Sequence, residues 1–185
     1  MPPRNLVLTV ALSLATGLAT GLATGLSACS EPAASADQTA TVLLPAGLVL
    51  ATAPAGAVRV PQAKASAQEG DAVVVRGRVG GERNPIVPGR ASLRLADTEA
   101  IAACDTRPDD GCKLPWDYCC EPTEKILDNS MTAQVVGDSG KVLAADFTTL
   151  DGLAPGSMLV VKGIVAARPN DKVLTPNATG IFVER

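Results

Sequence analysis

Two segments of the chain share a pattern that restricts the fold to a small β structure. Residues 74–79 read Val-Val-Arg-Gly-Arg-Val and residues 160–165 read Val-Val-Lys-Gly-Ile-Val, and a glycine followed by a polar residue precedes each of them. Apolar and polar side chains alternate along the first segment with the period of two that is typical of a β-strand. A glycine inside a strand weakens it and usually marks a bulge or a sharp bend. Because small closed barrels need such bends, we expect both segments to be strands of one barrel.

Three further segments have the composition of strands. The region from Ala91 to Leu95 alternates apolar and polar residues, and the region from Met131 to Val136 ends in the turn sequence Gly-Asp-Ser-Gly. We therefore expect five strands, over residues 71–79, 91–95, 131–136, 158–166 and 173–183. The last contains Pro176, which cannot donate a ladder hydrogen bond and so indicates an edge or a bulge. Residues 142–153 are ambiguous and could hold a short helix.

Five short strands, the first of them bent at a glycine, resemble the OB-fold, a small all-β, five-stranded Greek-key barrel. The resemblance covers residues 70–185, although another small antiparallel barrel or sandwich would give a similar pattern. OB-folds that bind single-stranded nucleic acid stack bases on aromatic side chains. The second and third expected strands carry no aromatic residue, and the net charge of the chain is −3. We therefore expect no nucleic-acid partner, since such partners normally require a basic face.

The first 28 residues have the features of an export signal. Arg4 precedes an uncharged apolar run, residues 6–26. The last residue of the run begins the sequence Leu26-Ser27-Ala28-Cys29. About 20 apolar residues could also span a bilayer, but no basic stop-transfer cluster follows Cys29. The sequence Leu-Ser-Ala-Cys resembles the lipobox of bacterial lipoproteins. In that family the signal is removed, and the cysteine is lipidated and becomes the first residue of the mature chain.

The lipoprotein resemblance implies a permanent membrane tether at Cys29, since these proteins carry more than one acyl chain. Ser30 in place of an Asp after the cysteine is similar to the pattern that sorts lipoproteins to the outer membrane, so we expect the periplasmic face of that membrane. Residues 29–69 would then connect the tether to the barrel. Their first part has the composition of a flexible spacer. Residues 42–60 are apolar and are expected to pack in part on the barrel, and residues 61–69 could be a short helix or a linker.

The insertion between the second and third expected strands, residues 98–130, contains every cysteine except Cys29, namely Cys104, Cys112, Cys119 and Cys120. An even number of cysteines in an exported protein favours disulfides. A bond between the neighbours Cys119 and Cys120 would be strained, which leaves two pairings. These are Cys104–Cys119 with Cys112–Cys120, and Cys104–Cys120 with Cys112–Cys119. Each disulfide would stabilise the fold by about 2–4 kcal/mol.

Metal binding and redox chemistry are alternatives for the same thiols. Structural zinc sites usually use Cys-x-x-Cys pairs, and the spacing here departs from that pattern. Copper(I) would also suit these thiolates, whereas thiol redox chemistry normally uses Cys-x-x-Cys or a thiolate stabilised by a nearby group. Asp109, Asp110 and Asp117 could bind calcium, but they lack the alternation of an EF-hand loop. Disulfides are therefore favoured, and no metal or other cofactor is expected.

Two sets of residues are candidates for a binding surface. Trp116 and Tyr118 are the only Trp and the only Tyr, and both lie in the insertion, in Pro-Trp-Asp-Tyr-Cys-Cys-Glu-Pro. They could anchor a partner, or Trp116 could cap the barrel. The string Pro-Trp-Asp-Tyr-Cys-Cys also resembles small exported bacterial proteins of unknown role that carry it on an OB-like domain. Arg76, Arg78 and Arg94 could form a basic patch or an ordinary solvated strand face.

Catalysis has little support in the sequence. The chain contains no histidine, which excludes the Ser-His-Asp and Cys-His arrangements, and it contains no phosphate-binding glycine-rich loop. We therefore predict a non-catalytic envelope lipoprotein that acts as a binding or scaffold module for a protein, a glycan or a small ligand. The alternative is a metal-handling or thiol-redox protein that uses the four cysteines of the insertion.

Overall fold

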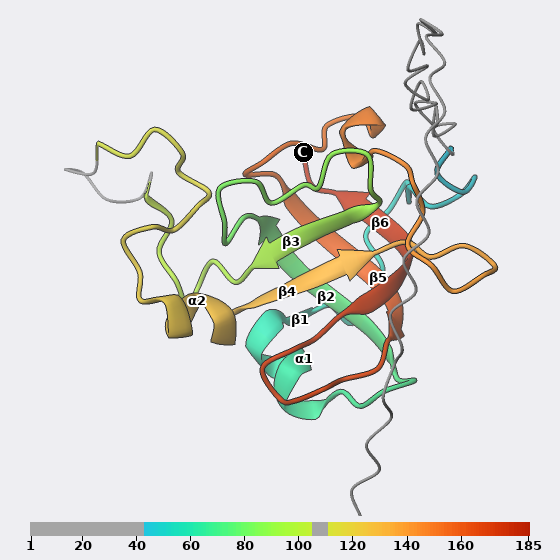
Figure 1. Ribbon diagram of the computed structural model, residues 1–185, viewed down its shortest axis with the longest axis horizontal. Helices are drawn as coiled ribbons and strands as arrows, with labels where there is room; N and C mark the ends of the chain where they lie inside the picture. Colours follow the sequence, from blue (N-terminus) through green and yellow to red (C-terminus); the bar gives the residue numbers. More distant parts are fainter. Residues whose placement is uncertain (1–42, 105–110) are drawn as a thin grey trace, which may run out of the picture. The chain divides into compact units, whose positions relative to one another are not determined.

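Five strands close into a barrel in the part of the chain that the computed structural model describes, residues 43–104 and 111–185 (Figure 1). The order around the barrel is β2 (Ala72–Val79), β3 (Ser92–Ala96), β4 (Ser130–Gln134), β6 (Pro176–Val183) and β5 (Met158–Val165). Pairing of β2 with β5 closes the barrel, and β4 and β6 run parallel, whereas the other neighbouring strands of the barrel are antiparallel. This architecture confirms the expected small all-β, OB-like barrel.

Alternation along the strands decides which side chains fill the barrel. In β2, Val73, Val75 and Val79 are buried, while Arg76 between them is exposed. Apolar side chains from all five strands form the core together with Phe147, and β4 contributes Met131 and Ala133. Phe147 begins the short 3₁₀ helix η2 (Phe147–Thr149), which lies in the segment that the sequence left ambiguous. The scarcity of aromatic residues is therefore met by a core of Val, Leu and Ile around one phenylalanine.

Gly163 of β5, the fourth barrel strand in chain order, lies where two backbones come close together. The register between β5 and β6 shifts between Lys162 and Gly163, which is the bulge that the glycine predicted. A Cβ atom at Gly163 would lie 2.5 Å from the Asn177 carbonyl oxygen. The other strand glycine, Gly77 of β2, is less crowded, since a Cβ there would lie 3.2 Å from the Ala96 carbonyl oxygen. Gly163 is thus required by the strand crossing itself.

The last strand starts later than the sequence suggested. Pro176 is the first residue of β6, not an interruption within a strand that begins at Val173. A proline is tolerated at the start of a strand because the first residue does not have to donate a hydrogen bond to the neighbouring strand.

The segment before the barrel packs on it. Val49 bridges to Ile181 of β6, and Leu48 is buried in the barrel core. Strand β1 (Val58–Arg59) pairs in parallel with the middle of β2, with Val58 opposite Val75, and helix α1 (Val60–Ser66) follows without a break. Val60 at the start of that helix is fully buried in the same core.

The insertion between β3 and β4 has a small core of its own. Ala96 lies opposite Arg78 in the β2–β3 pairing, so it points out of the barrel, yet it is fully buried. It is covered by a second cluster of buried residues from the insertion, Ile101, Ala103 and Tyr118. Ile126 of helix α2 (Thr123–Asp128) packs against this cluster. The insertion, drawn in yellow shades at the left of Figure 1, is therefore folded onto the outer wall of the barrel.

Several predictions from the sequence fall outside the described residues. These are the signal, Cys29 with its lipidation, the first part of the spacer, and Asp109 and Asp110. Within the described ranges, no helix combines the length and the apolar character that crossing a bilayer would require.

Candidate functional site

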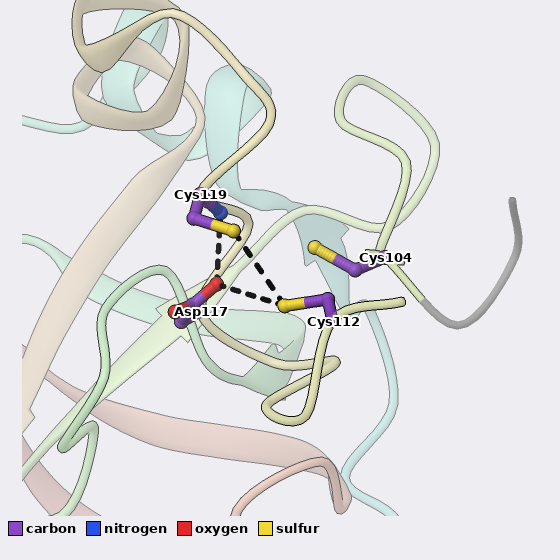
Figure 2. A group of neighbouring side chains, drawn as sticks. All are labelled: Cys104, Cys112, Asp117 and Cys119. Atoms are coloured by element: carbon purple, nitrogen blue, oxygen red, sulfur yellow. Dashed lines mark hydrogen bonds between the residues drawn. The ribbon is translucent and has the colours of Figure 1, made fainter. Parts of the chain in front are cut away.

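Three thiols and one carboxylate of the insertion point toward one another (Figure 2). One ligand atom from each of Cys104, Cys112, Asp117 and Cys119 lies within 4.8 Å of the other three. The Sγ atom of Cys112 is 3.5 Å from the Sγ atom of Cys119 and 3.9 Å from Oδ1 of Asp117. Cys104 is buried and Cys119 is exposed. We call these four residues the thiol cluster; Cys104 lies on its protein side and Cys119 on its solvent side.

The expected disulfides are not present. No two sulfur atoms of Cys104, Cys112, Cys119 and Cys120 are at bonding distance, since a disulfide requires about 2.05 Å. The reason is geometric: three of the sulfurs converge on one point, so they do not divide into two pairs. The fourth position around that point is occupied by Asp117. The Cys120 sulfur, which does not belong to this group, lies 3.9 Å from that of Cys119.

A tight turn at Tyr118 brings Asp117 and Cys119 to the same side. Tyr118 has φ 57°, in the left-handed region that costs a bulky residue about 1–3 kcal/mol. Its ring is fully buried in the core of the insertion, and this burial offsets the backbone strain. Oδ1 of Asp117 accepts a 2.8 Å hydrogen bond from the backbone N–H of Cys119, which fixes the carboxylate beside the sulfurs.

The aromatic residues of the insertion hold it in place. The indole Nε1 of Trp116 donates to the Arg83 carbonyl at 3.1 Å, and the Trp116 carbonyl accepts from the Gly81 N–H at 2.8 Å. Trp116 is half-buried, in line with a capping role. Tyr118 is completely buried, so the expectation that it offers a recognition surface is corrected: its ring is needed in the second core, over the outward-facing Ala96.

Asp97, the residue that joins β3 to the insertion, is held by a side chain that the sequence did not single out. Asp97 is buried and accepts hydrogen bonds from Nε and Nη2 of Arg59, at 3.0 and 2.6 Å. It also accepts the backbone N–H groups of Glu99 and Ala100, at 3.0 and 2.7 Å. Burial alone raises the pKa of Asp97, but these hydrogen bonds outweigh it and bring the pKa below its ordinary value. Arg59 could not be identified from the sequence, because its role depends on a two-residue strand.

Two thiols of the cluster, those of Cys104 and Cys119, hold their protons more tightly than an ordinary cysteine. Burial and the contact with Cys112 raise the pKa of Cys104 to about 11. The contacts with Cys112 and Asp117 also raise the pKa of Cys119. Neighbouring negative charges in the cluster repel one another, so several thiolates can coexist only when a positive charge lies among them.

The three arginines that could form a basic patch are each engaged by neighbouring groups. Arg76 makes two hydrogen bonds of 2.7 Å with the carboxylate of Glu184, which cancels its charge. Arg78 donates to the Gly156 carbonyl at 3.0 Å. Arg94 donates to the Ser130 hydroxyl at 3.1 and 2.6 Å. The three arginine side chains on the outer face of β2 and β3 are therefore each bonded to neighbouring groups of the protein.

Asp117 is the residue of the cluster whose role the sequence analysis missed, because it was considered only as a calcium ligand. Its position two residues before Cys119 is the signal that could have found it.

Comparison of the chain with models of protein families, with curated proteins and with solved structures gave no match.

Proposed function

We propose that the protein is an envelope lipoprotein that is anchored through Cys29 at the periplasmic face of the outer membrane. In this proposal its barrel is a non-catalytic scaffold, and the insertion between β3 and β4 is the part that meets a protein, a glycan or a small ligand. The observation that carries the proposal is the way the insertion is fastened: a separate core on the barrel wall, the Arg59–Asp97 pair and the two hydrogen bonds of Trp116.

The sequence supports the rest of this proposal. Leu26-Ser27-Ala28-Cys29 follows an apolar run, and Ser30 comes next. A chain without histidine lacks the usual acid–base residue at neutral pH, which favours binding over catalysis. A net charge of −3 and the lack of aromatic residues in β3 and β4 disfavour nucleic acid as the partner.

The anchor is tested by lipidation of the full chain in a bacterium with two membranes. We expect the wild-type protein to incorporate labelled fatty acid and to sediment with outer membranes, and Cys29→Ser to lose the label. Cys120→Ser is the control, because it removes an exposed thiol that is not in the lipobox. A wild-type chain without fatty acid, or a Cys29→Ser variant that keeps it, would contradict the proposed anchor.

The binding surface is tested by photo-crosslinking in intact cells. A photoreactive residue replaces either Lys113 of the insertion or Lys162 of β5, and both positions are exposed. We expect a discrete crosslinked product from position 113 and none from position 162. Equal products from both positions, or none from either, would contradict a partner at the insertion.

The second candidate function is metal handling or thiol redox chemistry, and the thiol cluster is the observation that favours it. The two classes differ in what the cluster holds. A metal-handling protein holds an ion between the sulfurs, whereas a redox protein joins two sulfurs, and the two thiols pass two electrons and two protons to an oxidant such as a quinone or another disulfide.

A further inference from the structure

We propose that Cys104, Cys112, Asp117 and Cys119 form a tetrahedral site for one zinc ion, with three thiolate sulfurs and one carboxylate oxygen as ligands. The site would fasten the insertion to itself. The proposal is independent of the membrane anchor and of any partner.

The distances suit a tetrahedron around zinc. With Zn–S bonds of about 2.3 Å and a Zn–O bond of about 2.1 Å, two sulfurs lie about 3.8 Å apart and a sulfur and an oxygen about 3.6 Å apart. The corresponding distances here are 3.5 Å between the sulfurs of Cys112 and Cys119, and 3.9 Å between the Cys112 sulfur and Oδ1 of Asp117. All four ligand atoms lie within 4.8 Å of one another.

The donor atoms select the ion. Thiolates bind soft or borderline cations such as zinc and copper(I), whereas calcium and magnesium require oxygen ligands. The carboxylate oxygen of Asp117 makes the set four-coordinate, as in structural zinc sites, in which all ligands come from the protein. A copper(I) ion would be satisfied by sulfur atoms alone and would have no need of Asp117. The geometry therefore favours zinc in a structural role.

The surroundings of the cluster favour bound thiolates and a fixed carboxylate. The backbone N–H of Cys119 holds Oδ1 of Asp117 at 2.8 Å, and a backbone hydrogen bond from Cys120 reaches the sulfur of Cys104. Such contacts orient metal ligands and stabilise their charged form.

Cys120 provides a matched control. It is adjacent to Cys119 and equally exposed, and its sulfur lies 3.9 Å from that of Cys119, but it does not belong to the thiol cluster. Loss of its thiol therefore tests whether proximity alone is enough. The rival arrangement is a disulfide between Cys112 and Cys119, which would remove two ligands at once.

The first experiment measures metal content. The full chain carrying Cys29→Ser, which leaves only the four thiols of the insertion, is purified in detergent with a reductant and analysed by native mass spectrometry and elemental analysis. We expect one zinc per chain. Replacement by cobalt(II) should give thiolate-to-cobalt charge-transfer bands and the intense visible bands of tetrahedral coordination. A protein without zinc that also gives no such cobalt spectrum would overturn the proposal.

The second experiment measures affinity in variants of that chain by competition with a chromophoric chelator. Cys112→Ser should weaken zinc binding by at least about 100-fold, more than the loss of a supporting contact around a metal site. Cys120→Ser should change it by less than about 2-fold. Asp117→Asn, which keeps the shape of the side chain, should alter the visible cobalt bands even if the affinity changes little. Circular dichroism confirms that each variant is folded.

Three results would overturn the zinc site. One is an equal loss of affinity in Cys120→Ser and Cys112→Ser. Another is a cobalt spectrum that is the same with and without Asp117→Asn, which would point to a sulfur-only site. The third is a Cys112–Cys119 disulfide, found by peptide mapping, in protein isolated from the envelope without reductant.

Discussion

Arg59, the last residue of β1, binds Asp97, which lies 38 residues further along the chain and joins β3 to the insertion. The side chain of Asp97 is 3% exposed and that of Arg59 is 36% exposed, so the carboxylate depends on this guanidinium far more than the guanidinium depends on it. The pair joins the segment before the barrel to the base of the thiol-bearing loop.

Asp97→Asn should lower the free energy of unfolding by about 1–3 kcal/mol, because a buried group loses charged hydrogen bonds from Arg59 and retains only part of its backbone contacts. Urea denaturation of the full chain measures the change. Glu99→Gln is the control, since Glu99 also contacts Arg59, at 2.9 Å, but its side chain is 65% exposed. That variant should change stability by less than about 1 kcal/mol, and an equal effect would show that burial of Asp97 is unimportant.

The same carboxylate should make the fold sensitive to acid. The pKa of Asp97 is lower in the folded chain than its ordinary value of 3.8, so the unfolded chain binds more protons as the pH falls through that range. The stability that Asp97 contributes is therefore complete above its ordinary pKa and is lost as the pH falls toward the folded one. Urea midpoints measured across this range should fall less steeply in Asp97→Asn than in the wild type. Parallel curves would contradict the assignment.

Gly80→Ala should loosen the insertion from the barrel. A Cβ at this position would lie 2.6 Å from the Trp116 carbonyl oxygen and 3.0 Å from Cε2 of Tyr118, and the first of these is backbone that cannot rotate away. We expect a loss of about 1–3 kcal/mol and faster hydrogen exchange in the insertion. Gly111→Ala is the control within the same insertion, since a Cβ there meets nothing within 4 Å. Similar exchange in the two variants would contradict this packing.

Gly163→Ala should be more damaging than Gly77→Ala, although both change the glycine of the same repeated strand pattern. The new Cβ would lie 2.5 Å from the Asn177 carbonyl oxygen in the first case and 3.2 Å from the nearest atom in the second. Thermal denaturation of the two variants measures the difference. If Gly77→Ala were the more destabilising change, the bulge at Gly163 would not be the tighter strand crossing.

The barrel could be predicted because its information is local. Alternation places Val73, Val75 and Val79 inside, and the glycine of the repeated pattern marks the bulge at Gly163. β1 could not be predicted in the same way, because two residues are too few to show a period.

The thiol cluster could not be predicted from the sequence, because it depends on packing that the spacing of the cysteines does not reveal. The even number of cysteines in the insertion suggested crossed disulfides, but the left-handed turn at Tyr118 places Asp117 beside the sulfurs. That turn is stable because the ring of Tyr118 packs in one buried cluster with the small, outward-facing Ala96. Whether an aromatic residue of an insertion is exposed or buried therefore depends on the surface against which the insertion packs.

The parallel pairing of β1 with β2 gives the fold a mechanical property. A pull on the chain from the N-terminal side of β1 acts along the strand, so the hydrogen bonds of that pairing are sheared together and not opened one after another. Arg59 is at the end of this strand and binds Asp97, so part of a force that acts on β1 would pass through this ion pair to the base of the insertion.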